Sequence, residues 1–177
     1  MERFVAFLRG INVSGQKLIN MEALRKVLAE ADFADVKTYI QSGNVLFTFD
    51  EKNSDELILI LEELIKTKFG FRTDVILRKY SDIESIVNSP WFSTLKFEND
   101  KKYYITFLKS EYPEKLTVPL FSQNMDVEII HQDNMDLISI STLYKGTYGF
   151  PNNFIEKLTG IPATTRNPNT LENILKL

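Results

Sequence analysis

The spacing of apolar residues over the first eighty positions is the feature that most constrains the fold. Residues 3–11 are nearly all apolar, which predicts a central strand that is covered on both faces. Apolar residues then recur at helical spacing after Asn20, which predicts a capped helix over residues 20–30. The same patterns predict strands over residues 36–41, 45–49 and 73–78, and a second helix that starts at Asn53 or Ser54 and ends at Gly70.

This order of strand, helix, strand, strand, helix and strand is the split βαβ, or ferredoxin-like, plan. The second half repeats the plan in blurred form. It predicts strands over residues 103–108, 127–131, 137–141 and 163–166, an irregular helix over 113–120, a helix from Pro151 to Gly160 and a last helix over 170–176. We therefore predict an α+β fold of two tandem ferredoxin-like (βαββαβ) halves, the second degraded, with a short C-terminal helix. The predicted divisions are 1–79, a connecting helix and loop over 80–100, and 101–177.

The composition narrows the classes of protein that fit. The chain has 177 residues, of which 44% are apolar and 25% charged, as in ordinary globular proteins. It has no cysteine, which excludes disulfides, thiolate metal sites and cysteine nucleophiles. No stretch is long enough to span a bilayer and the N-terminal apolar run is too short for a signal peptide, so we expect a cytoplasmic protein without a membrane partner. The net charge of −3 disfavours broad coating of nucleic acid, although a local basic site stays open.

Two polar loops are predicted to meet at one end of the first half. One follows the first strand and is framed by Gly10 and Gly15, and the other is the turn around Gly43. In the predicted plan both lie at the same end of the sheet, and their cations, hydroxyls, amides and N–H groups suit an anionic or polar ligand. The ligand-binding residues predicted from these loops are Arg9, Asn12, Ser14, Gly15, Lys17, Tyr39, Gln41, Ser42 and Asn44. The alternative is a purely structural pair of turns, in which Arg9 pairs with a carboxylate.

The segment 164–170 offers a further candidate site. Arg166 and Asn167 stand just before a short helix that Asn169 or Thr170 would cap. A helix N-terminus beside an arginine is suited to an anion, so we include Arg166 and Asn167 among the predicted ligand-binding residues. A capped C-terminal helix with a salt-bridged arginine explains the same residues equally well.

The sequence motifs of nucleotide hydrolysis and of metal binding are incomplete in this chain. Residues 10–17 nearly match the phosphate loop of nucleotide hydrolases, but Lys17 comes one position late and Leu18 replaces the hydroxyl residue that would hold magnesium. His131 is the only histidine and is assigned to the surface, so we predict no metal site and no cofactor.

Four aromatic residues on predicted strands invite comparison with RNA-recognition motifs. Phe47 and Phe49 lie on the third strand, and Tyr103 and Tyr104 open the first strand of the second half. Because the basic-glycine-aromatic opening of those motifs is missing, we assign all four side chains to the core.

Three segments carry a resemblance to a known family. Residues 8–15 (LRGINVSG), 38–45 (TYIQSGNV) and 164–170 (TTRNPNT) resemble the signatures of a bacterial family of uncharacterised proteins known as domain of unknown function 1697. The chain departs from that pattern at Ser14, where the family usually has glycine, and at Pro168, where it usually has tryptophan. The resemblance implies an α+β fold with tandem ferredoxin-like halves, and it implies no activity.

We therefore expect an intracellular protein that binds an anionic or polar ligand, such as a phosphate-bearing metabolite or a short nucleic acid, at the two loops. An enzyme that uses the same loops, a transferase or a hydrolase, is the first alternative. The second is a protein-interaction module with an apolar surface around Leu59 and Trp91. Whether the chain forms a homodimer stays open.

Overall fold

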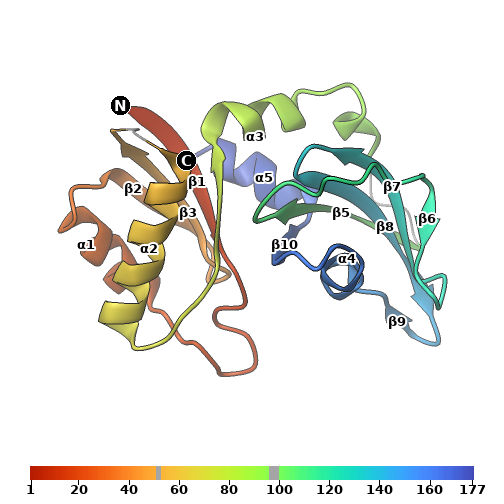
Figure 1. Ribbon diagram of the computed structural model, residues 1–177, viewed down its shortest axis with the longest axis horizontal. Coiled ribbons are helices and arrows are strands. Elements are labelled where there is room, and N and C mark those ends of the chain that lie inside the picture. The colour runs from red at the N-terminus through yellow and green to blue at the C-terminus, as the bar shows by residue number, and fades with distance from the viewer. Residues whose placement is uncertain (51–52, 96–99) are drawn as a thin grey trace. The chain divides into compact units, whose positions relative to one another are not determined.

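The computed structural model describes residues 1–50, 53–95 and 100–177 (Figure 1). These residues form a mixed α/β fold with two antiparallel sheets and five α-helices. The chain divides into two compact units: the first unit holds residues 1–86 and 172–177, and the second unit holds residues 87–171. Each unit has its own sheet, so each can be described by itself.

The first unit is built on a four-stranded sheet in the order β2-β3-β1-β4. Its elements are β1 (Glu2–Leu8), α1 (Met21–Ala29), β2 (Ala34–Tyr39), β3 (Asn44–Phe49), α2 (Ser54–Phe69), β4 (Val75–Lys79) and α3 (Tyr80–Val87). All neighbouring strands are antiparallel, and α1 and α2 pack on one face of the sheet (Figure 1). The central position of β1 agrees with its nearly continuous apolar sequence.

The helices of this unit begin and end at the residues that their sequences indicate. The Asn20 side chain accepts a hydrogen bond from the Ala23 N–H at the start of α1, and Asn53 accepts one from Asp55 at the start of α2. Gly70 ends α2 with a φ of 80°, the left-handed conformation that favours glycine. These three predicted helix limits are confirmed.

The core between the sheet and the two helices is aromatic at its centre. The rings of Phe4 and Phe47 stack with centroids 5.8 Å apart, and the Phe33 ring meets Phe47 edge-on at 5.0 Å. Phe47 is fully buried, as predicted, and Phe49 is partly buried and packs against the same cluster. The fold of the first unit therefore rests mainly on apolar burial.

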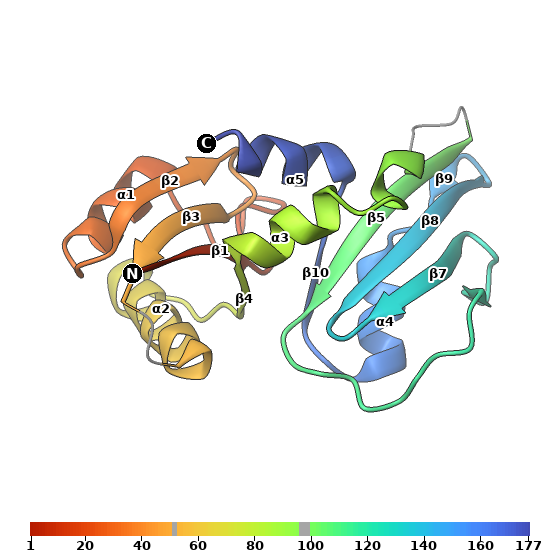
Figure 2. The ribbon, with the colours of Figure 1, turned by 90° about the horizontal axis from the view of Figure 1, so that it is seen from above.

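The second unit has a sheet in the order β10-β5-β8-β7-β6, with β9 paired to β8. Its elements are β5 (Lys101–Leu108), β6 (Leu120–Phe121), β7 (Val127–Asp133), β8 (Asp136–Tyr144), β9 (Thr147–Tyr148), α4 (Pro151–Thr159), β10 (Ala163–Arg166) and the start of α5 (Pro168–Leu175). Figure 2 shows β5, β8 and β7 side by side, with α4 on one face of the sheet. Pro151 opens α4 and Gly160 ends it, as predicted.

The helix predicted over residues 113–120 is wrong. The chain there is irregular until the two residues of β6. Pro113 and Pro119 supply no N–H group for a helical ladder, and the Gln132 side chain fixes the segment instead. Its Oε1 accepts a hydrogen bond from the Leu116 N–H at 2.7 Å, and its Nε2 donates to the Glu114 carbonyl at 3.1 Å.

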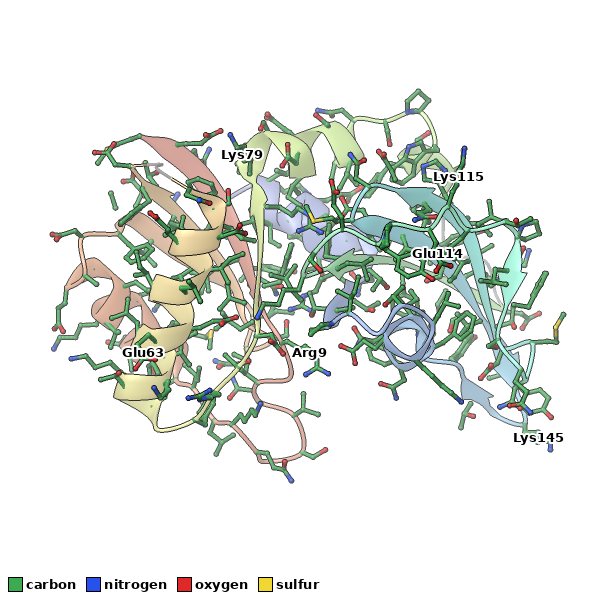
Figure 3. The ribbon with its side chains drawn as sticks, in the orientation of Figure 1. Arg9, Glu63, Lys79, Glu114, Lys115 and Lys145 are labelled. Carbon is green, nitrogen blue, oxygen red and sulfur yellow. The ribbon has the colours of Figure 1, made fainter. Side chains whose placement is uncertain are left out.

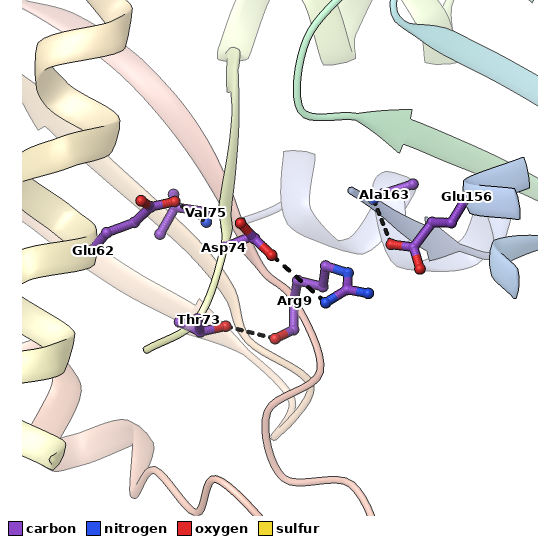
Figure 4. Close-up of polar contacts among 7 residues, drawn as sticks. All are labelled: Arg9, Glu62, Thr73, Asp74, Val75, Glu156 and Ala163. Carbon is purple, nitrogen blue, oxygen red and sulfur yellow. Dashed lines mark hydrogen bonds and ion pairs between the residues drawn. The ribbon is translucent and has the colours of Figure 1, made fainter. Parts of the chain in front are cut away.

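Each unit contains a hydrogen bond from the first residue of its last strand to a glutamate on the helix that precedes that strand. In the first unit the Glu62 carboxylate on α2 accepts a hydrogen bond from the N–H of Val75, the first residue of β4. In the second unit Glu156 on α4 accepts one from the N–H of Ala163, the first residue of β10 (Figure 4). A charged acceptor thus satisfies the backbone donor at the same point in both units.

The sheet of the second unit is more polar inside than that of the first. Thr106 and Thr165 are buried on neighbouring strands and their hydroxyls lie 2.8 Å apart. Ser139 is also fully buried, and its hydroxyl is the one buried side-chain polar atom without a hydrogen-bond partner among the described residues. Buried polar groups of this kind contribute less to stability than apolar side chains do.

Candidate functional site

The loop between β1 and α1 has an unusual backbone. Five of its residues have positive φ values, between 47° and 74°: Gly10, Asn12, Ser14, Gly15 and Lys17. Three of them are not glycine, and such conformations cost free energy unless the surroundings hold them. Residues 13–18 are all exposed, so this part of the loop is available to a ligand.

The Asn12 side chain holds this loop and joins it to the β2–β3 turn. Its Nδ2 donates to the carbonyls of Ile19 at 3.0 Å and Gln41 at 2.7 Å, and its Oδ1 accepts from the Ile19 N–H at 2.8 Å. The two predicted loops therefore lie together. Both amide hydrogens of Asn12 are used within the protein, so its side chain is an anchor of the site rather than a free donor.

The β2–β3 turn is packed closely against the end of β1. A Cβ atom at Gly43 would lie 2.8 Å from side-chain atoms of both Leu8 and Ile11, and Gly43 has a φ of 77°. Asn44 is buried, and its Nδ2 donates at 3.0 Å to the Tyr39 carbonyl and to the Ser42 hydroxyl. Ser42, Asn44 and the backbone of Tyr39 therefore shape the turn, and Gln41 is the exposed polar side chain in it.

Arg9 lies at the foot of the loop and forms an ion pair. Its Nη1 is 3.6 Å from the Asp74 carboxylate, and the Thr73 hydroxyl donates to its backbone carbonyl at 2.6 Å (Figure 4). The Arg9 side chain remains 36% exposed. Its charge is therefore shared with an acid but is not withdrawn from solvent.

An open hollow of about 340 Å³ lies beside this loop, which we call the α2 hollow. It is lined by Lys17, Leu59, Glu62, Glu63, Lys66, Arg72, Thr73 and Asp74. The side chains of Lys17 and Arg72 form no hydrogen bond or ion pair with the described residues, whereas the acids have partners. Arg72 and Thr73 are not among the ligand-binding residues predicted from the sequence, although their place after Gly70 puts them at the same end of the sheet.

Glu63 illustrates how the acids of the α2 hollow are neutralised. It lies on the last turns of α2 (Figure 3), where the Lys66 ammonium donates to its two oxygens at 2.8 and 2.9 Å. This hydrogen bond, with the nearby charges of Lys66 and Arg72, holds the pKa of the Glu63 carboxyl below its usual value. The positive charge available to a ligand therefore comes from Lys17 and Arg72, with Arg9 close by.

Arg166 and Asn167 belong to the second unit and are described within it. The Arg166 Nη1 donates to the Thr164 hydroxyl at 2.6 Å and to the Thr165 carbonyl at 2.9 Å, and burial lowers its pKa to about 10. Arg166 is therefore still a cation at neutral pH. Asn167, rather than Asn169 or Thr170, caps α5 by accepting the Thr170 N–H at 2.9 Å.

His131 is exposed, as predicted, with its ring 5.9 Å from that of Trp91. Within the described ranges, no group of three or more histidine, aspartate or glutamate side chains is placed to hold a metal ion. In the same ranges, no helix is long and apolar enough to cross a membrane.

Comparisons with known proteins identify relatives of unknown function. The profile of the family described as "Protein of unknown function (DUF1697)" matches residues 1–136. A conserved bacterial protein from Streptococcus pneumoniae, SP0830, has a similar solved structure: the TM-score is 0.63 at 22% sequence identity, over 99% of this chain and 97% of that one. No curated protein matches the chain significantly in sequence. The structural similarity supports the fold alone.

Proposed function

The chain belongs to the DUF1697 family of proteins of unknown function, and we propose that it binds an anionic ligand in the α2 hollow and the adjoining loop. The ligand would be a phosphate-bearing metabolite or a short nucleic acid. The observation that carries the proposal is the pair of cations Lys17 and Arg72, which line one hollow without ion pairs of their own among the described residues. Two such cations can bind a phosphate group.

The anchoring of the loop supports the same function. Asn12 fixes the base of the loop, while Ser14, Gln16 and Lys17 project from its exposed part. A loop held in strained conformations before the ligand arrives loses little conformational entropy on binding. The hydroxyl of Ser14 and the amides of Gln16 and Gln41 would then supply directional hydrogen bonds.

A specific observation also favours a second candidate, a protein-interaction surface. Val13, Leu18 and Ile40 are 58%, 66% and 53% exposed around the anchored loop, and Leu59 on α2 is 64% exposed. Exposed apolar side chains gathered in one region are typical of contact surfaces. This candidate predicts binding that is insensitive to loss of Lys17 and Arg72.

We also infer that both units follow the ferredoxin-like plan and arose by duplication. The strand orders β2-β3-β1-β4 and β7-β8-β5-β10 correspond when the two-residue strands β6 and β9 are left out and the remaining strands are numbered within their unit. The bridges from Glu62 to Val75 and from Glu156 to Ala163 occupy matching positions. The missing helix between β5 and β7 is the main departure.

Thermal shift measurements test the binding proposal. The wild type, a Lys17→Ala/Arg72→Ala double variant and a Lys26→Ala control are heated with nucleotides, phosphorylated metabolites and short RNA and DNA strands. Lys26 is an exposed lysine in the last turn of α1 and does not line the hollow. At about a hundred times its dissociation constant a ligand stabilises by roughly 2.7 kcal/mol, which raises the Tm of a chain of this size by about 5–11 °C.

We expect this shift in the wild type and in Lys26→Ala, and its loss in the double variant. An equal shift in all three proteins would place the ligand elsewhere and contradict the proposal. If no compound shifts the Tm, the protein-interaction candidate replaces it, and Leu18→Ser and Leu59→Ser become the next variants.

A further inference from the structure

A second hollow, of about 310 Å³, lies within the second unit at the end of β10. The last residue of β10, Arg166, pairs with Ile105, whereas β5 begins at Lys101. The first part of β5 thus runs past the end of β10, where the chain turns into α5. We call this space the β5 hollow; its lining includes Lys102, Tyr103, Tyr104, Asn167, Pro168 and Asn169.

The lining combines aromatic rings with amides. Tyr103 and Tyr104, which we predicted in the core, are half-buried and lie at this hollow. Asn167 and Asn169 supply carboxamides, and none of the described lining residues carries a carboxylate. The volume lies at the lower end of the range for small-molecule sites, about 300–1,000 Å³.

The Tyr104 hydroxyl is a donor with no hydrogen-bond partner among the described residues. Its ring meets Phe150 edge-on, with centroids 6.3 Å apart, which fixes the ring in place. Burial, reinforced by the neighbouring Tyr148, raises the pKa of the Tyr104 phenol, so the group stays protonated at neutral pH. A ligand acceptor would satisfy this half-buried donor.

Asn167 and Lys102 complete the polar groups. The Asn167 Oδ1 accepts hydrogen bonds from the N–H and the hydroxyl of Thr170, both at 2.9 Å, so its amide NH₂ is the part that can serve a ligand. The Lys102 Nζ lies 3.8 Å from the centre of the Tyr148 ring, which holds the ammonium at one place.

This set of groups discriminates among ligand classes. A cation would find no carboxylate among the described lining residues, and an apolar ligand would leave the Tyr104 hydroxyl unsatisfied. A lone phosphate would find only one ammonium in the described lining, that of Lys102. A planar heterocycle can in addition contact the Tyr104 ring and pair its polar edge with the Asn167 amide.

We propose that the β5 hollow binds the base of a nucleotide, either a free mononucleotide or an unpaired nucleotide of a single strand. The Tyr104 ring contacts the face of the base, the Tyr104 hydroxyl and the Asn167 amide donate to acceptors on the nucleotide, and Lys102 meets its phosphate. This site is distinct from the α2 hollow and does not depend on ligand binding there.

Isothermal titration calorimetry on the full chain tests the proposal. The protein carries Lys17→Ala and Arg72→Ala, which removes the proposed anion site of the first unit from the measurement. The probes are adenosine 5′-monophosphate, ribose 5-phosphate and a single-stranded RNA of six adenosines. The variants are Tyr104→Phe, Tyr104→Ala and the control Tyr144→Phe, an exposed tyrosine on β8 that does not line the hollow.

We expect adenosine 5′-monophosphate to bind at least tenfold more tightly than ribose 5-phosphate. Tyr104→Phe should weaken its binding roughly two- to tenfold through loss of one hydrogen bond. Tyr104→Ala should weaken it roughly tenfold or more, because the stacking surface is lost as well. Tyr144→Phe should leave it unchanged. Tighter binding of the RNA than of the mononucleotide would identify a single strand as the source of the base, and equal binding a free nucleotide.

Three results would overturn the proposal. The first is the absence of binding by all three probes, and the second is equal affinity for ribose 5-phosphate and the mononucleotide. The third is wild-type affinity in both Tyr104 variants. The Tm of Tyr104→Ala is measured alongside, and Tyr104→Phe, which keeps the ring, provides the test if the alanine variant does not fold.

Discussion

The two units keep the same strand order but cover their sheets differently. In the first unit α1 and α2 pack on one sheet face, and the fully buried Phe4 and Phe47 stack beneath them. In the second unit α4 covers the corresponding face, while the connection after β5 is irregular. Tyr104 stands as far from the end of β5 as Phe4 does from the end of β1, and Ser139 stands as far from the start of β8 as Phe47 does from the start of β3. Tyr104 and Ser139 are paired in register, as Phe4 and Phe47 are.

This difference explains where polar groups appear. A sheet face covered by two helices can bury large aromatic rings, whereas a face that lacks one helix leaves part of its surface accessible. Tyr104 fits such a half-covered position, because its half-buried ring meets Phe150 edge-on and its hydroxyl has no hydrogen-bond partner among the described residues. The second unit thus has a hollow with hydrogen-bonding groups beside this strand.

Among the variants that probe the difference between the units, Phe47→Ala should have the largest effect on stability. Removing a fully buried ring that packs with Phe4 and Phe33 should lower the free energy of unfolding by about 3–5 kcal/mol. Urea unfolding monitored by circular dichroism measures the change. A cost below about 1 kcal/mol would show that the aromatic cluster is not what stabilises the first unit.

The next comparison is between a glycine in a turn of the first unit, Gly43, and one in a turn of the second unit, Gly146. Gly43→Ala should lower the free energy of unfolding by about 2–4 kcal/mol, because the new Cβ would clash with Leu8 and Ile11 and because alanine is strained at positive φ. Gly146 also has positive φ but nothing within 4 Å of an added Cβ, so Gly146→Ala should cost only about 1–2 kcal/mol. Chemical denaturation of both variants decides whether the β2–β3 turn is the more tightly packed.

Removing the carboxylates of Glu62 and Glu156 tests whether their hydrogen bonds contribute equally to the stability of the two units. Glu62→Ala and Glu156→Ala should each cost about 1.5–3 kcal/mol, because each leaves a strand N–H without its charged acceptor. Amide hydrogen exchange should accelerate at Val75 in the first variant and at Ala163 in the second. Glu30→Ala, at an exposed glutamate, should change neither rate; unequal responses at Val75 and Ala163 would argue against equivalent bridges.

The smallest effect should come from Ser139→Ala. The hydroxyl is fully buried without a partner among the described residues, so its removal should change the free energy of unfolding by less than about 1 kcal/mol and in the stabilising direction. Differential scanning calorimetry measures the shift in Tm. A clear loss of stability would show that the hydroxyl has a hydrogen-bond partner, such as a buried water molecule.

Local signals in the sequence predicted much of the secondary structure. Asn20 and Asn53 cap helices, and Gly70 and Gly160 end them, because these functions depend on residues within one turn. The helix predicted over residues 113–120 is wrong because the Gln132 side chain, which is distant in the sequence, holds this segment in an irregular conformation.

The roles of the site residues were less predictable for the same reason. Asn12 and Asn44 have the residue type of ligand-binding amides, yet their hydrogen bonds go to the protein's own backbone. Arg72 carries no distinctive motif and becomes notable only through its place at the α2 hollow. Function as an anchor or as a free donor depends on partners that the folded chain supplies.

The three hydrogen bonds of Asn12 divide the loop into a fixed base and an exposed outer part. Two of them join Asn12 to Ile19 and close the loop at its base, so that residues 13–18 form an exposed segment outside the hydrophobic core. Substitutions in that segment leave the packing of the sheet and helices untouched. The side chains at these six positions can therefore vary without disturbing the core, which makes residues 13–18 suitable for randomised libraries.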